Sequence, residues 1–146
     1  GDSSRFHDRL LKKTSHFAEI NAFLTGDLEN GLFIISAKLS DGTSYELAEQ
    51  LIERELDDLL ENGISDDELV KVKNKTEATY EFGKTSVLNK AMGLAISALI
   101  QSPDLINNEF QSYDKVTASN LQRVAASVLR KENRSRLIYK ARKHDK

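Results

Sequence analysis

Apolar residues at helical spacing open the chain. Phe6, Leu10 and Leu11 would share one face of a helix, which predicts a helix from Ser3 to about Thr14. Asp2 or Ser3 could cap it, because a short polar side chain can accept hydrogen bonds from the first free N–H groups of a helix.

Two strands are predicted next. Residues from Ala18 to Thr25 alternate between apolar and polar, as a half-buried strand does. Residues from Leu32 to Leu39 begin with a continuous apolar run, which indicates a strand buried on both faces. Because turn-forming residues stand at both ends of the six positions between them, an antiparallel hairpin with a rather long loop is the simplest interpretation.

Two long amphipathic helices follow the hairpin. Thr43 to Glu46 forms a capping-box pattern with Thr43 as the cap, ahead of an apolar stripe that ends at Asn62-Gly63. Ser65 to Glu68 is a stronger capping box and begins the second helix, and Gly83 is a predicted break.

Three shorter elements and a strand complete the pattern. A helix is predicted from about Ser86 to Ile100, where Ser102-Pro103 ends it, and another from Asp104 to about Tyr113. Thr117 should cap a further helix. The apolar run Leu137-Ile138-Tyr139 predicts a strand from Arg134 to Ala141, and Arg142 to Lys146 should be a frayed tail.

This order of elements predicts an α+β fold. Amphipathic helices would pack on one face of a small, mainly antiparallel sheet, giving two layers. The whole chain, residues 1–146, fits one domain. Three strands make a thin sheet for so many helices, so we expect the domain to be incomplete, with further strands upstream of Gly1.

Composition excludes several classes of protein. The chain has no cysteine, which rules out disulfides and thiol catalysis. A formal net charge of −2 gives no overall attraction to nucleic acid or to an anionic membrane. No apolar run approaches the ~20 residues that a membrane-spanning helix needs.

Three segments together resemble the insulinase/pitrilysin-type zinc metallopeptidases, a family that includes the mitochondrial processing peptidases. Residues 1–6, Gly-Asp-Ser-Ser-Arg-Phe, are similar to the family's G-x-S-S-R-L loop and helix start. Residues 62–74 are similar to its G-I-S-x-x-E-L-x-K-x-K helix start, the most specific of the three. Residues 113–125 are similar to the V-T-x-x-D-L-x-x-V-A segment, with Asn120 where the family often has Asp.

The resemblance implies a C-terminal, non-catalytic domain. The family's catalytic motif, H-x-x-E-H on a helix, places two zinc-binding histidines one turn apart with a glutamate base. This chain has His7, His16 and His144, and no two of them are four residues apart. Residues 16–19 imitate the start of the motif, but Ile20 replaces its second histidine and a strand is predicted there.

Other candidate sites are better explained structurally. Glu77 and Glu81 lie one helical turn apart without a histidine or arginine on their face, so we expect a solvated surface. No serine stands in a G-x-S-x-G context, which leaves Ser86, Ser97 and Ser102 without support as nucleophiles. The basic C-terminal segment, residues 130–146, has Tyr139 as its one aromatic residue, which disfavours nucleic-acid binding.

The resemblance also implies two substrate-binding residues. In the family's C-terminal domain, an Arg and a Tyr seven residues later often contact the peptide in the assembled chamber. Arg9 fits the Arg by position, and His16 stands where Tyr is expected. The alternative for Arg9 is a salt bridge on a helix surface.

Two functions remain open at this point. The first is the non-catalytic portion of a zinc-dependent endopeptidase, which helps to enclose an extended peptide opposite a zinc-bearing half that is a separate domain or subunit. Zinc would then be a cofactor of that half and not of this chain. The second is a catalytically degenerate scaffold or dimerisation module, whose incomplete sheet could pair with another copy. Family relatives in bacteria are often periplasmic, which favours that compartment or the envelope.

Overall fold

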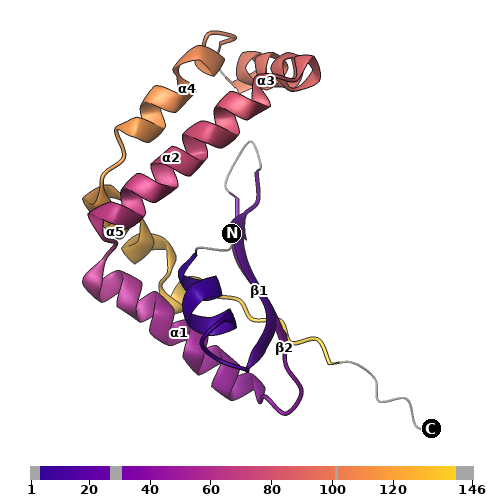
Figure 1. Ribbon diagram of the computed structural model, residues 1–146, viewed down its shortest axis with the longest axis vertical. Helices are drawn as coiled ribbons and strands as arrows, with labels where there is room; N and C mark the ends of the chain where they lie inside the picture. The colour runs from indigo at the N-terminus through magenta and orange to yellow at the C-terminus, as the bar shows by residue number, and fades with distance from the viewer. Residues whose placement is uncertain (1–3, 27–30, 101, 141–146) are drawn as a thin grey trace, which may run out of the picture.

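The computed structural model describes residues 4–26, 31–100 and 102–140 (Figure 1). Within them the chain forms a short π-helical turn, one hairpin, five α-helices and a final 3₁₀ turn. Their bounds are η1 Phe6–Leu11, β1 Phe17–Leu24, β2 Phe33–Leu39, α1 Tyr45–Asn62, α2 Asp66–Gly83, α3 Val87–Ile100, α4 Leu105–Asp114, α5 Ala118–Val128 and η2 Lys131–Asn133. The predicted α+β class is confirmed.

The predicted hairpin is also confirmed. β1 and β2 pair antiparallel, with Ile20 opposite Ala37 and Ala22 opposite Ile35. The register shifts between Phe17 and Glu19, which lets Phe17 turn inward at the start of β1.

The core lies between η1, β1 and the first half of α1. Leu10 of η1, Phe17 and Ile20 of β1 and Ala48 of α1 are buried against one another. Their burial excludes water from one face of the hairpin, and this apolar contact ties the sheet to the helices. The partly buried residues packed around them are Phe6, Leu11, Ile35, Leu39, Leu51 and Ile52.

The prediction that β2 is buried on both faces is wrong. Ile35 and Leu39 pack on the core, but Ile34 on the opposite face is only half-buried, and Ser36 and Lys38 beside it are exposed. The core formed with η1 and α1 includes Ile35 and Leu39 and does not include Ile34, Ser36 or Lys38.

The predicted N-terminal helix is shorter than expected. The turn η1 begins at Phe6 and ends at Leu11, not Thr14, whose hydroxyl instead donates to the Leu10 carbonyl oxygen at 2.5 Å. This bond satisfies a carbonyl that a continuing helix would have used. The predicted caps, Asp2 and Ser3, lie outside the described residues.

At the start of α1 the predicted cap is wrong by one residue, and at its end the predicted glycine stop is confirmed. The cap is Ser44, not Thr43, because Ser44 is extended and its hydroxyl accepts from the Leu47 N–H at 3.2 Å. Gly63 ends the helix as predicted, with φ of 69° and ψ of −153°. Only glycine adopts this backbone conformation without strain.

The other helix starts and stops agree with the sequence. Ser65 and Glu68 form a complete capping box at the start of α2, and the helix ends at Gly83. Thr117 and Asn120 form a second box at the start of α5. The side-chain oxygens thereby satisfy N–H groups that have no partner inside the helix.

The helices follow an open arc around the hairpin (Figure 1). α5 packs on α1 at one end of the arc, and α4 packs on α2 and α3 at the other. The long helix α2 connects the two ends, and the hairpin lies on the inner side of the arc. No helix among the described residues has the length and apolar character that crossing a bilayer requires.

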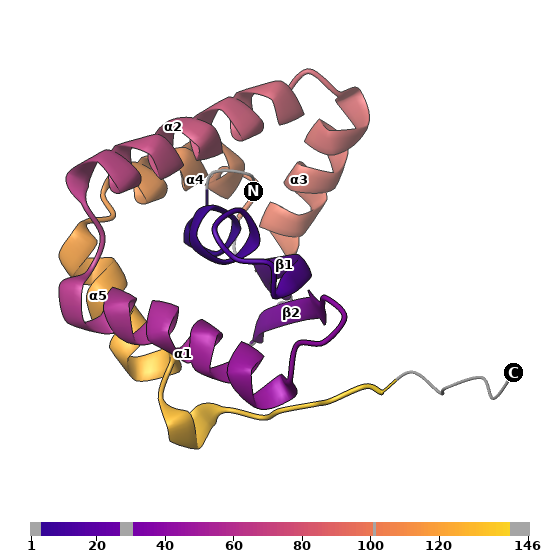
Figure 2. The same cartoon turned by 60° about the horizontal axis from the view of Figure 1, so that its bottom comes forward.

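The predicted C-terminal strand is wrong for the described part, residues 134–140. This segment is extended but unpaired, and it runs along α1 (Figure 2). A strand needs a hydrogen-bonded neighbour, and no described strand lies beside it. Ala141 and the predicted tail to Lys146 lie outside the described residues.

Replacing Gly63 with alanine should destabilise the domain. The added Cβ would meet Gln122 at an ordinary 3.6 Å, so the cost is backbone strain at φ of 69° and should be about 1–3 kcal/mol in urea unfolding. Gly83→Ala is the matched control, because its Cβ meets nothing within 4 Å and its φ is not positive. A Gly63→Ala midpoint equal to that of Gly83→Ala would contradict this account.

Candidate functional site

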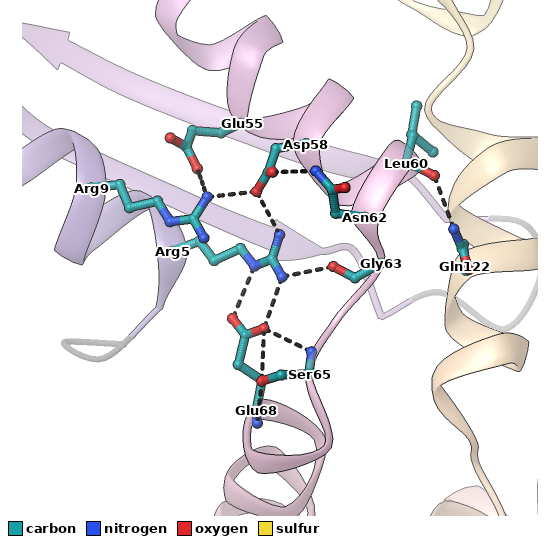
Figure 3. A network of polar contacts seen from close by, with 10 residues as sticks. All are labelled: Arg5, Arg9, Glu55, Asp58, Leu60, Asn62, Gly63, Ser65, Glu68 and Gln122. Atoms are coloured by element: carbon teal, nitrogen blue, oxygen red, sulfur yellow. Dashed lines mark hydrogen bonds and ion pairs between the residues drawn. The ribbon is translucent and has the colours of Figure 1, made fainter.

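Arg5 connects the start of the chain to the junction between α1 and α2 (Figure 3). Its guanidinium donates to both carboxylate oxygens of Glu68, from Nε at 2.9 Å and from Nη2 at 2.8 Å. Nη2 also donates to the Gly63 carbonyl oxygen at 2.7 Å, and Nη1 donates to Asp58 at 3.2 Å. Planar, bidentate pairing of this kind is the strong form of an arginine–carboxylate contact.

Glu68 has two roles in this contact. Its carboxylate accepts from Arg5 and also from the Ser65 N–H at 3.2 Å, while its own N–H donates to the Ser65 hydroxyl. The Arg5 hydrogen bonds lower the pKa of Glu68 to about 2, against an opposing effect of burial. The helix start of α2 and the anchoring of Arg5 therefore use one ionised carboxylate.

Arg9 extends the contact along α1. Its Nη1 donates to Glu55 at 3.1 Å and to Asp58 at 2.6 Å. Asp58 thus lies between two guanidinium groups, and the pKa of its carboxyl is lowered, first by Arg9 and then by Asn62. We refer to Arg5, Arg9, Glu55, Asp58, Gly63 and Glu68 as the Arg5 network.

The three sequence segments that carry the family resemblance meet at this junction. Arg5 comes from the first and Glu68 from the second. Gln122, from the third, donates to the Leu60 carbonyl oxygen at 3.0 Å near the end of α1 (Figure 3). Residues of all three segments therefore lie at the α1–α2 junction, although the segments are far apart in the sequence.

A hollow of about 240 Å³ lies beside the network. Arg5 and Glu55 contribute charged groups to its edge, and the hairpin and α1 contribute mainly apolar side chains. Neither Arg9 nor His16, the predicted substrate-binding residues, is among the residues that line it. The lining residues are Ser4, Arg5, Phe6, His7, Ile20, Asn21, Ala22, Phe33, Glu55, Leu56 and Leu59.

The structure places Arg9 and His16 on different elements. Arg9 leaves η1 toward α1 and keeps 40% of its side chain exposed despite its two partners. His16 precedes β1 and lies half-buried, with Nδ1 3.4 Å from the Thr43 hydroxyl. The substrate role of the pair stays a prediction, since a peptide-binding chamber would include surfaces of another domain.

Residues 16–20 have strand geometry at the position of the apparent zinc motif. Ile20 is buried in the core, and β1 directs alternate side chains to opposite faces. No cluster of three or more histidine, aspartate or glutamate side chains in residues 4–26, 31–100 and 102–140 could hold a metal ion. His144 lies outside those ranges.

The remaining candidates have local structural roles. Glu81 pairs with Lys84 at 2.7 Å, and Glu77 is exposed on α2. The Ser86 hydroxyl accepts from the Asn89 N–H, the Ser102 hydroxyl accepts from the Asp104 N–H, and Ser97 is buried in α3.

Comparison with known proteins decides the family. The family model described as the peptidase M16 inactive domain matches residues 1–76, just over half of the chain. The chain belongs to this family. This M16 domain is therefore of the non-catalytic type, and the expected metallopeptidase relationship is confirmed. The search of curated proteins found no match.

Solved structures share the fold of the M16 domain. A protease from Helicobacter pylori superposes with a TM-score of 0.79 at 20% identity, covering 87% of this chain and 31% of that one. A candidate zinc protease from Bordetella pertussis Tohama I gives 0.78 at 20% identity, with 92% and 74% covered. The inactive peptidase domain of a candidate zinc protease from Bordetella parapertussis gives 0.80 at 18% identity, with 98% and 78% covered. The M16 domain thus spans about a third of the Helicobacter protein.

Arg5→Ala should destabilise the M16 domain more than Arg9→Ala. The first change removes both guanidinium hydrogen bonds of Glu68 and the donor of the Gly63 carbonyl, in a site where Arg5 is only 19% exposed, so we expect a loss of about 2–3 kcal/mol. Arg9 is more exposed, and its loss should cost about 1 kcal/mol or less. Equal effects in urea unfolding would contradict the central position of Arg5.

Acid should remove the contribution of Glu68. A carboxyl whose pKa is lower in the folded state stabilises the fold above its unfolded value of 4.5, and the stabilisation is lost as pH falls toward about 2. The difference in unfolding free energy between wild type and Glu68→Gln should therefore shrink across that window. In an Arg5→Ala background the same comparison should depend much less on pH, and an unchanged dependence would contradict the assignment to Arg5.

Proposed function

We propose that this M16 domain is the non-catalytic half of a zinc-dependent metalloendopeptidase. It would help to enclose an extended peptide opposite a zinc-bearing half. The observation that carries the proposal is the family match, which names an inactive peptidase domain over residues 1–76. The sequence supports it, because no pair of histidines has the spacing of a zincin-type helix.

In this proposal the catalytic groups come from the other half. Zinc bound there would act as a Lewis acid and lower the pKa of a bound water. Among the residues that the structure describes, no histidine and carboxylate cluster fits that metal, and Ile20, where the motif would need its second histidine, is buried in the core. This chain's contribution would be to bind and orient the peptide and to exclude water from it.

The fold would present a preformed, rigid surface to a bound peptide. The Arg5 network fixes the angle at which α2 leaves α1, and α2 sets the distance between the two ends of the arc (Figure 1). A surface held by a core and by ionic contacts can receive an extended peptide without first being ordered. In this proposal Arg9, whose side chain is 40% exposed on η1, would donate a hydrogen bond to the peptide. His16, which precedes β1, would provide a second polar group.

Peptide cleavage should require both halves. We expect this chain alone to show no stoichiometric zinc site by calorimetry and no cleavage of unfolded peptides, whereas a mixture with the zinc-bearing half should cleave them. A tight zinc site in the chain alone would contradict the proposal. So would a cleavage rate of the zinc-bearing half that does not rise when this chain is added.

Arg9→Ala should raise the KM of the assembled peptidase several-fold and change kcat less, because a lost peptide contact weakens binding first. His16→Ala should act in the same direction. Arg123→Ala is the charge-matched control, since Arg123 is exposed on α5, which packs on the outer helix α1. If all three variants have the same KM, the substrate role of Arg9 and His16 fails while the role of the half remains.

A scaffold or dimerisation module is the second candidate function. The apolar exposure of α3 favours it, since Val87 is 81% exposed and Leu99 is 70% exposed. Apolar surface of this kind usually marks a contact with another protein. If the mixture with the zinc-bearing half forms a stable complex that never cleaves peptides, the scaffold reading replaces the peptidase reading.

A further inference from the structure

We draw no further inference here: the strongest candidate, the exposed apolar surface of α3 around Val87, Met92 and Leu99, carries nothing, because nothing in the part of the chain that the structure describes shows what covers it.

Discussion

The contact between Arg5 and Glu68 joins the N-terminal turn to the first turn of α2, and the direction of α2 depends on it. The core ties η1, the hairpin and the first half of α1 together, but it ends before the α1–α2 junction. Beyond that point Arg5 joins the N-terminal turn to Gly63 and Glu68, and Gln122 joins α5 to the last turn of α1. A few polar contacts therefore set the angle of α2, and with it the place of α3 and α4. Since Glu68 also caps α2, the same carboxylate fixes where the helix starts and where it points.

Much of the fold could be predicted from local signals. Gly63, the Ser65 box and the Thr117 cap each act through contacts within four residues, so the sequence carries them directly. Alternation in residues 18–25 is likewise sufficient for β1. The cap of α1 was missed by one residue, because Thr43 and Ser44 are both good caps and only the extended backbone of Ser44 decides between them.

The remaining features depend on partners far away in the chain. Arg5 and Glu68 are separated by 63 residues, and their pairing has no periodic signal, although both stand in recognisable segments. The strand predicted at residues 134–140 has the right pattern, but pairing requires a neighbour that the sequence pattern cannot supply. The continuous apolar run of β2 likewise predicts two buried faces, whereas only Ile35 and Leu39 of this strand pack on the core. The zinc motif could be excluded by spacing alone, because its chemistry needs two histidines on one helical face.

A double-mutant cycle between Arg5 and Glu68 tests the central claim most directly. Unfolding free energies of wild type, Arg5→Ala, Glu68→Ala and the double variant would give the coupling between the two side chains at neutral pH. If this contact holds the α1–α2 junction, the coupling should be about 1.5–3 kcal/mol, as for a hydrogen bond between charged partners. Additive effects, with a coupling below about 0.5 kcal/mol, would contradict the claim that this contact holds the α1–α2 junction.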